Sequence, residues 1–512
     1  MIAQDSDTAA CADAPPQLNA RSPALRFAEG TALCGLLLYA VFAPHSIAGA
    51  WIALSVSIAG FIARTFISRR ASLPRRTPLD LPLWLFYAWS VLSALLSAEP
   101  RVSLLKLISV SSFLIFYLVR SLVTRRTAFA IALLMIASGA AGALWSISEV
   151  ARGRGVIIDE IAPDSPLRHP SLRVAAGDCL WRVNGRHIDS VAEIDEAIRR
   201  TPTGAQLKLS LFSQGEQVER AGLIVTGEIK ARPSPASVRG TRRSHRFRAS
   251  GWTRHYQTFA ETLQILAQLA LGFALAQMQR RTATPSFSRL RLALFAAAFL
   301  LLATGIALTA MRTALVAFAI GASVVAWRSA VGGGRARVVV SVAIVLALAF
   351  GAFAVWRTRA EGALRLQDES SRLRLAVARV AVARIPTRPL FGHGMDAMQR
   401  HWTEWGFPGD DMLHTHSTPI QLAFDRGLPA LFLWLWLLVA FWLILTRAEK
   451  QFRTSPDAGI HGLLLGATGS LAGFFASSLV NYNFGDAEVA LVLWWLMGTV
   501  VKTVSSERSS QN

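Results

Sequence analysis

The residues best suited to chemistry are arginines and histidines in the polar segments of an otherwise apolar chain. His414 and His416 flank a threonine, and a histidine with an ordinary pKa of roughly 6.5 can act as a general base near neutral pH. Arg254, Arg312 and Arg372 are candidates for binding phosphate, because the planar guanidinium group suits phosphate oxygens better than a lysine ammonium does. Together these side chains could bind a diphosphate and remove a proton from an attacking hydroxyl group.

A membrane-embedded scaffold must position these side chains. The 512 residues are 53% hydrophobic and 17% charged, and the mean hydropathy is +0.39. Apolar runs near the length that spans a bilayer recur along the chain, which predicts an all-α polytopic membrane protein of about twelve transmembrane helices. The predicted spans lie near Leu25–Phe42, Ile47–Ile62, Leu81–Leu96, Leu104–Val119, Ala128–Ile147, Phe259–Met278, Leu292–Leu308, Ala314–Trp327, Val338–Val355, Pro429–Leu445, Leu463–Val480 and Val489–Val501.

Alternate loops between these runs are rich in arginine and lysine, which sets the orientation. By the positive-inside rule the basic loops and both termini lie in the cytoplasm. The same parity places the two long polar inserts, Ser148–Thr258 and Trp356–Ser417, on the periplasmic side. We therefore predict a multi-pass protein of the bacterial inner membrane, with the three arginines and both histidines facing the periplasm.

The positions of the basic residues and of the cysteines argue against a nucleic-acid-binding protein and against a metal site or a disulfide framework. The net charge of +21 could indicate a nucleic-acid partner, but the arginines beside apolar runs are a topology signal, so no nucleic acid is expected. Cys11, Cys34 and Cys179 form neither a metal-binding spacing nor a disulfide framework. The residues up to Ala24 lack the pattern of a cleaved signal peptide, so we expect the first apolar run to be a retained helix.

The first polar insert has the pattern of a small strand-and-helix domain. Short apolar runs at Val156–Ile158 and Leu207–Leu211 indicate strands, and a helix is predicted at Val191–Arg200. Asn184-Gly185 is a strong signal for a hairpin turn. Together with Ser165-Pro166 and Gly177-Asp178, this order resembles a bacterial PDZ domain.

The resemblance implies an α+β domain that binds an extended peptide at a sheet edge, although a scaffold without a peptide partner is the alternative. The basic stretch from Lys230 to Trp252 is expected to be a linker, either a solvated tether or a segment that approaches lipid phosphates.

The second polar insert carries a more specific pattern. The run Pro389–Gly394 (Pro-Leu-Phe-Gly-His-Gly) is followed by His414-Thr415-His416, then by Asp425 and Gly427-Leu428. This order resembles the signature segment of the bacterial O-antigen ligase and polymerase family. Counting back from Gly427, the histidine of that family falls on His416. Ser417 stands where the family usually has asparagine, and His414 is an additional histidine.

Three upstream arginines extend the resemblance. Thr309–Arg312 resembles the family's Thr-x-Ser-Arg motif, with methionine in place of serine. Arg254 resembles the arginine just before the helix that follows the long loop, although Gln257 replaces a common glycine there. Ser370-Ser371-Arg372 resembles the start of the amphipathic helix before the Pro-Leu-Phe-Gly turn, and Arg374 competes with Arg372 for that register.

The resemblance implies a GT-C-like membrane glycosyltransferase that uses neither a metal nor a cofactor. It would transfer a glycan from a polyprenyl-diphosphate donor to an acceptor hydroxyl on the periplasmic side. The implied roles are catalysis by His416 and Arg312, donor diphosphate binding by Arg254, Arg312 and Arg372, and accessory parts for His414, Arg374 and Asp425.

Several functions stay open at this point. The acceptor could be a lipid A core glycolipid, as in lipopolysaccharide synthesis, a growing O-antigen or exopolysaccharide, or a protein hydroxyl, and the PDZ-like insert favours a protein partner. A transporter of lipid-linked glycans is less consistent with helix interiors that are almost bare of ionisable residues, with Glu29 and Lys106 as the main exceptions. An intramembrane metalloprotease is excluded because His-Glu-x-x-His does not occur in the sequence.

These interpretations divide the chain into eight parts. The expected parts are a cytoplasmic tail (1–24), N-terminal membrane helices (25–150), the PDZ-like domain (151–229), the basic linker (230–253), further membrane helices (254–356), a periplasmic catalytic loop (357–418), C-terminal membrane helices (419–504) and a cytoplasmic tail (505–512).

Overall fold

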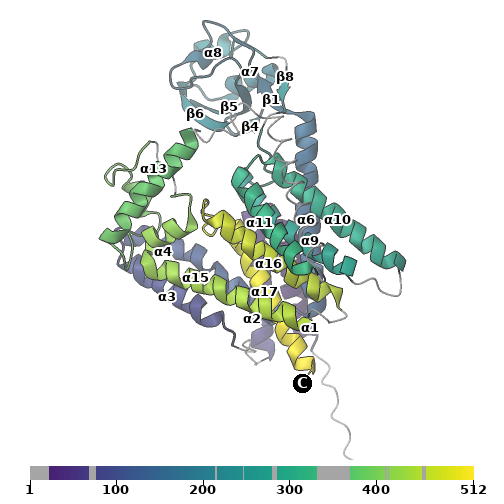
Figure 1. Cartoon of the computed structure of the whole chain (residues 1–512). Helices are drawn as coiled ribbons and strands as arrows, with labels where there is room; N and C mark the ends of the chain where they lie inside the picture. Colours follow the sequence, from purple (N-terminus) through teal and green to yellow (C-terminus); the bar gives the residue numbers. More distant parts are fainter. Residues whose placement is uncertain are drawn as a thin grey trace, which may run out of the picture.

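The helices form one body with a small insert at one end. The computed structural model describes residues 22–68, 76–213, 216–240, 242–245, 247–279, 285–330, 369–409, 412, 414–452 and 457–511. Within these ranges nine helices are long and apolar enough to cross a membrane, which confirms a helical, polytopic membrane protein. Figure 1 shows the strands of the insert gathered at one end of the helical body and the C-terminus at the other.

The N-terminal part of the body precedes the insert. Its elements are α1 (Pro23–Phe42), α2 (Ile47–Ser68), α3 (Asp80–Leu95), α4 (Pro100–Val110), the 3-10 turn η1 (Ser111–Phe113), α5 (Leu114–Leu122) and α6 (Arg125–Arg152). α4, η1 and α5 follow one another and together form one span, Pro100–Leu122. α3 is apolar but has only 16 residues, so it is shorter than the nine spans.

The C-terminal part contains the helices that bear the candidate site residues. Its elements are α9 (Tyr256–Gln279), α10 (Pro285–Leu308), α11 (Arg312–Ser329), α13 (Glu369–Arg384), the 3-10 turn η3 (Ile385–Thr387), α14 (Ala397–Arg400), α15 (Thr418–Phe452), α16 (Ala458–Ser478) and α17 (Ala487–Gln511). Eleven of the twelve predicted spans fall on these helices or on those of the N-terminal part. The twelfth, at 338–355, lies outside the described residues, so the count of twelve stays a prediction.

The most buried membrane helix is α9, which packs against α10, α11 and α16. Small residues permit the contact with α16. A Cβ atom on Gly272 would lie only 2.4 Å from the carbonyl oxygen of Gly462 and from the amide nitrogen of Gly466. Such small-residue contacts let two helix backbones approach closely, which stabilises helix pairs in lipid through van der Waals packing. α9 is therefore a central support for the elements around it.

The insert is built around an antiparallel sheet. Its elements are β1 (Arg154–Ile157), β2 (Glu160–Ile161), the 3-10 turn η2 (Pro166–Arg168), β3 (Cys179–Val183), β4 (Arg186–His187), α7 (Val191–Arg200), β5 (Gln206–Ser213), β6 (Glu216–Ile224), α8 (Gly227–Ala231), β7 (Val238–Arg239) and β8 (Arg242–Ser244). The main sheet has the order β6-β5-β3-β1-β8, with β4 paired to β3, and β2 pairs separately with β7.

Local sequence signals in the insert are confirmed. The predicted helix Val191–Arg200 is α7, and the side chain of Ser190 caps it by accepting a hydrogen bond from the amide of Glu193. Asn184 and Gly185 both have positive φ, 49° and 80°, as a tight turn between β3 and β4 requires.

The stretch expected to be a linker is instead packed for much of its length. It contains the last two residues of α8 and all of β7 and β8, and β8 pairs with β1 as an edge strand of the main sheet. Farther along, Phe247 and Ala249 are buried, and the Ala249 amide donates a hydrogen bond to the carbonyl of Leu308 at the end of α10 (3.1 Å). The stretch is packed and not a free linker because apolar side chains between its arginines are buried against the insert and the helical body.

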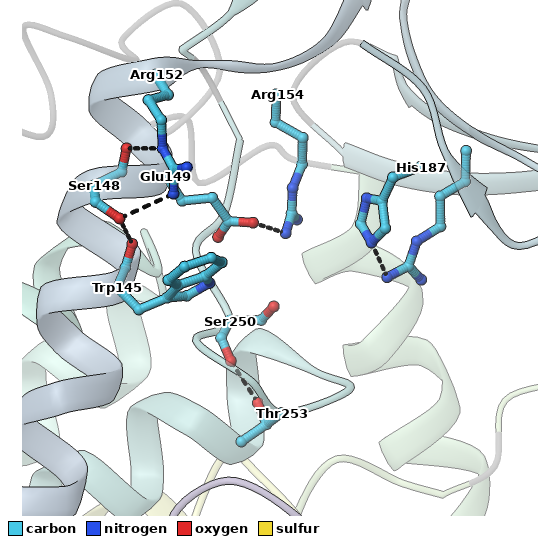
Figure 2. A network of polar contacts seen from close by, with 9 residues as sticks. Trp145, Ser148, Glu149, Arg152, Arg154, His187, Ser250 and Thr253 are labelled. Atoms are coloured by element: carbon cyan, nitrogen blue, oxygen red, sulfur yellow. Dashed lines mark hydrogen bonds and ion pairs between the residues drawn. The ribbon is translucent and has the colours of Figure 1, made fainter. Parts of the chain in front are cut away.

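An ion pair joins the insert to the end of α6. Figure 2 shows Glu149 of α6 directed at Arg154, the first residue of β1, and the two side chains form a salt bridge. The guanidinium carbon of Arg154 lies 4.8 Å from the ring centre of Trp181 and 4.9 Å from that of Phe247. A cation held between two aromatic rings is stabilised by their π electrons, so this junction holds β1, β3 and the Phe247 segment together above α6.

Candidate functional site

The first turns of α15 are set apart from the rest of that helix by a break at Gly427. Gly427 has φ 81° and ψ 171°, and Pro429 follows it. Because proline has no N–H group, the carbonyl of Asp425 cannot make its usual helical hydrogen bond. The break divides α15 into a short first segment, Thr418–Arg426, and a long membrane-spanning segment.

The Pro389–Gly394 turn fills this break. The amides of His393 and Gly394 donate to the carbonyl oxygens of Phe424 and Asp425 (2.8 and 2.9 Å), and the amide of Leu428 donates to Pro389 (2.8 Å). A Cβ atom on Gly427 would lie 1.8 Å from the carbonyl oxygen of Leu390, so only glycine fits. The two halves of the sequence motif therefore bind each other and fix the start of α15.

Trp89 of α3 and a backbone carbonyl of α13 complete this support. Trp89 of α3 donates from Nε1 to the carbonyl of Arg426 (2.9 Å) and stacks on Phe391 with ring centres 5.3 Å apart. His393 is buried, stacks on Phe424, and lies with Nε2 3.2 Å from the carbonyl of Arg384. His393 therefore has a packing role, in contrast to the histidines that follow.

The two candidate histidines lie in the turn that leads into α15. His416 has a left-handed backbone with φ 55°, its amide lies 3.2 Å from Nδ1 of His414, and the two ring centres are 4.3 Å apart. Nδ1 of His416 is buried, and among the described residues it has no hydrogen-bond partner. A non-glycine residue held in this strained region is typical of functional sites.

Burial and neighbouring positive charge keep both rings neutral. Burial lowers the pKa of His416 to about 3, with further contributions from His414, Arg374 and His255. Burial likewise lowers the pKa of His414 to about 4, followed by the charges of Arg374 and His255. Both effects disfavour the protonated ring. At neutral pH both rings are therefore neutral. The Nδ1 lone pair of His414 accepts the hydrogen bond from the amide of His416, and the ring of His416 keeps a lone pair that can accept a proton.

Asp425 supports the histidine turn indirectly, through hydrogen bonds made by Gln421. Its Oδ1 accepts a hydrogen bond from Nε2 of Gln421 (2.8 Å), and Oε1 of Gln421 accepts one from the amide of Thr415, between the histidines (2.7 Å). Asp425 is buried and borders a cavity of about 80 Å³ that Lys106 and Tyr482 also line. The side chain is thus connected to the histidine turn through Gln421.

The four candidate arginines lie in different surroundings. Arg374 of α13 is partly buried, its charge acts on both histidines, and its Nε has no hydrogen-bond partner within the described residues. Arg372, two residues earlier, is exposed. Arg312 is the exposed first residue of α11, and Arg254 is exposed just before α9, next to His255. The structure thus brings Arg374 and the histidines together, and leaves the other three arginines with exposed side chains.

The loop between α16 and α17 connects the starts of three helices, and sequence reasoning missed it. The carbonyl of Asn481 accepts from the amide of Thr418 at the start of α15 (3.1 Å), and its Nδ2 donates to Thr313, next to Arg312 (3.0 Å). Oγ1 of Thr258, near the start of α9, donates to Asp486 (2.5 Å). The available signal was three polar residues, Asn481, Asn483 and Asp486, in a short loop between two apolar helices.

A buried carboxyl group lies beneath this loop. Oε1 of Glu261 in α9 accepts a hydrogen bond from Ser477 (2.9 Å), and Ser477 in turn accepts one from Asn481 (3.1 Å). Glu261 is 2% exposed. The expectation that Glu29 and Lys106 are the main ionisable residues of the helix interiors is therefore wrong. A single acid within a long apolar run is easily overlooked in a pattern of hydropathy.

Comparisons with known proteins bear on the same region. Within the described residues, no group of three His, Cys, Asp or Glu side chains could hold a metal ion. No curated protein matches the chain. Residues 297–435 match the family model described as O-antigen ligase, and this range includes Arg312, Arg374, both histidines and the break in α15. Residues 297–435 of the chain are therefore similar to the O-antigen ligase family, and the similarity covers the segment that holds the candidate site.

Proposed function

We propose that this protein transfers a glycan from a polyprenyl-diphosphate donor to an acceptor hydroxyl on the periplasmic side of the inner membrane. The observation that carries the proposal is the cluster of His414, His416 and Arg374 at the start of α15, inside the range that matches the family. Neutral imidazoles beside a guanidinium group combine a proton acceptor with a phosphate-binding cation.

The proposed reaction is one displacement at the anomeric carbon of the donor sugar. The bond from that carbon to the diphosphate oxygen breaks, a bond to the acceptor oxygen forms, and the acceptor proton passes to the imidazole of His416. Arg312, Arg254 and Arg372 bind the departing diphosphate, whose negative charge increases as the bond breaks. The surroundings of Arg374 give it a larger part in this binding than those of the exposed Arg372.

Donor binding would also change the basicity of His416. In the free protein its pKa is about 3, which makes the imidazole a weak base. A diphosphate close to the ring favours the protonated form and raises the pKa. The histidine would therefore become an effective base only after the donor has entered.

The acceptor stays open among a lipid A core glycolipid, a growing glycan and a protein hydroxyl. A reaction with any of the three acceptors would use the same donor and the same residues, so the chemical identity of the product distinguishes the acceptors. A transporter of lipid-linked glycans is the second candidate, because the buried Glu261 is an ionisable residue in a membrane helix. Hydrogen bonds link Glu261 through Ser477 to Asn481 and so to the loop that connects the helix starts. This linkage favours a role for Glu261 in supporting the transfer site over a role in transport.

The test uses the purified protein in liposomes that contain a polyprenyl-diphosphate-linked glycan. Each acceptor class is added in turn, and both the free polyprenyl diphosphate and the glycosylated product are measured. We expect product with one acceptor and its loss in His416→Ala. His401→Ala is the matched control, because His401 lies in the same polar segment but contacts Glu404 and Glu99 instead. Movement of donor across the bilayer without product would instead support the transporter.

The side of the membrane needs a separate measurement. Glu404 is 69% exposed, so a cysteine at this position should react with a membrane-impermeant thiol reagent in intact spheroplasts. Protection of that cysteine until lysis would place the histidine segment in the cytoplasm and contradict the proposed use of a periplasmic donor.

A further inference from the structure

A hollow of about 620 Å³ lies at the start of α4, beside the end of α14. The residues that line it are Glu99, Pro100, Arg101, Val102, Leu105 and Arg400. We call it the Arg101–Arg400 hollow, after the arginine in the first turn of α4 and the arginine that ends α14. Two guanidinium groups on one concave surface are the donors that phosphate oxygens bind best.

The charges around the hollow do not balance. Arg400 lies 3.6 Å from the carboxylate of Glu99, and the same carboxylate also contacts Nε2 of His401 (3.3 Å). Among the described residues, the side chain of Arg101 forms no salt bridge or hydrogen bond. Two guanidinium groups and one carboxylate therefore leave the hollow with one excess positive charge, which the single negative charge of a phosphodiester would neutralise.

An apolar surface continues from the hollow along α4. Arg101, Leu105 and Ile108 are spaced i, i+4 and i+7, so they share one face of the helix. Leu105 is 71% and Ile108 68% exposed, and both belong to the membrane span Pro100–Leu122. At 1.5 Å per residue they lie about 6 Å and about 10 Å farther along the helix than Arg101. A phosphate at Arg101 with hydrocarbon beneath it has the chemistry of a phospholipid, whereas a free phosphate ion would leave the apolar face uncovered.

The same end of α4 is attached to the segment that follows the Pro389–Gly394 turn. Ser103 Oγ donates to the carbonyl of Met395 (3.2 Å), and Lys106 forms a salt bridge with Asp396 (2.6 Å). A ligand held by both arginines would add a further link between α4 and this segment, which ends at α14. It would therefore stabilise the folded arrangement around the turn.

We propose that the Arg101–Arg400 hollow binds the headgroup of an anionic phospholipid, with the phosphate between the two guanidinium groups and an acyl chain along Leu105 and Ile108. Phosphatidylglycerol has the matching chemistry, because its headgroup carries one negative charge and hydroxyl groups. Phosphatidylethanolamine carries the same phosphate, but its ammonium group would bring a further positive charge close to the arginines.

The experiment uses the full-length protein in a neutral detergent. Phosphatidylglycerol, phosphatidylethanolamine and inorganic phosphate are added in turn, bound lipid is measured by native mass spectrometry, and Tm is measured with and without each addition. The unchanged protein should bind phosphatidylglycerol more tightly than phosphatidylethanolamine and gain Tm with it. Arg101→Gln should weaken that binding about fivefold, the factor that corresponds to about 1 kcal/mol for one cation at a lipid phosphate, and Arg101→Gln with Arg400→Gln should weaken it further.

The matched control is Arg379→Gln with Arg388→Gln. It removes the same charge from two exposed arginines that do not line the hollow, and it should change the affinity little. Equal affinity in the Arg101–Arg400 variant and the unchanged protein would overturn the proposal. An equal loss in the control would do so as well, because it would show general attraction of charge and no specific site.

A second variant tests the lipid chain apart from the phosphate. Leu105→Gln keeps both arginines and changes an exposed side chain, so its Tm without lipid should match that of the unchanged protein, while its affinity for phosphatidylglycerol should be lower. Unchanged affinity in this variant, or a gain in Tm from inorganic phosphate as large as that from phosphatidylglycerol, would mean that a water-soluble anion fills the hollow. Equal binding of the two phospholipids would show that the headgroup charge is not recognised. Each of these outcomes would refute the lipid assignment.

Discussion

Replacing Gly427 by alanine should detach the Pro389–Gly394 turn from α15. The added Cβ would lie 1.8 Å from the carbonyl oxygen of Leu390 and 2.8 Å from that of Pro389, and both are backbone atoms that move only with the whole turn. Gly406 provides a matched control in the same polar segment. Its φ is 72°, close to the 81° of Gly427, but a Cβ there would meet nothing within 4 Å.

The comparison separates backbone strain from loss of the turn. Backbone with positive φ costs a non-glycine residue on the order of 1–3 kcal/mol, and both variants bear a cost of this kind. Only Gly427→Ala also displaces the three backbone hydrogen bonds between the turn and α15. At about 1 kcal/mol net for each hydrogen bond, Gly427→Ala should destabilise the protein by about 3 kcal/mol more than Gly406→Ala.

Thermal unfolding in detergent, followed by tryptophan fluorescence, measures this difference, because Trp89 stacks on Phe391 of the turn. We expect a clearly lower Tm for Gly427→Ala than for Gly406→Ala, together with loss of glycan transfer at temperatures where the protein is still folded. Equal Tm values for the two variants would refute the conclusion that the turn fixes the start of α15.

The remaining predictions concern the transfer site. His416→Ala should lower the rate on the order of 10²–10⁴-fold, and His414→Ala should be milder; the reverse order, measured with purified enzyme and lipid-linked donor, would move the base to His414. Arg374→Ala should weaken donor binding more than Arg372→Ala, as KM values for the donor would reveal. Arg312→Lys should recover only part of what Arg312→Ala loses, because lysine keeps the charge but not the two-donor geometry. The pKa values of His416 and His414 lie near 3 and 4 in the folded protein and near 6.5 in the unfolded chain. The contribution of the two neutral rings to the free energy of unfolding should therefore be fully present above pH 6.5 and fall as the pH drops towards 3. Over the same pH range, kcat/KM should show no histidine titration near 6.5.

Much of the site could be placed along the chain before its geometry was known. The pattern predicted that His416 lies at the end of the polar loop 357–418, and that Arg312 lies in the turn between the spans that end at Leu308 and begin at Ala314. In the structure α15 begins at Thr418 and α11 at Arg312. These are local statements. They depend on where an apolar run ends and a polar segment begins, which the water–lipid boundary determines residue by residue.

The structural role of the motif formed by the Pro389–Gly394 turn and Gly427 could not be predicted in the same way. Gly427 and the Pro389–Gly394 turn suggested a functional signature, whereas the contacts show that they bind each other. Similarly, the basic stretch after residue 230 suggested a linker, but β7 and β8 pair with strands more than 70 residues earlier. Such pairings depend on which backbone groups are left without a partner elsewhere, and hydropathy does not report that.

The sequence by itself therefore determined most of the apolar helices, the small mixed insert and the residue types of the proposed transfer site, because each follows from local apolar periodicity and side-chain chemistry. Only the tertiary structure decided which of these residues meet. It placed Arg374 and not Arg372 beside the histidines, and it joined the starts of α9, α11 and α15 through Asn481 and Asp486. The physical reason is that these contacts bridge positions far apart in the chain, so they depend on how the helices cross and pack against one another.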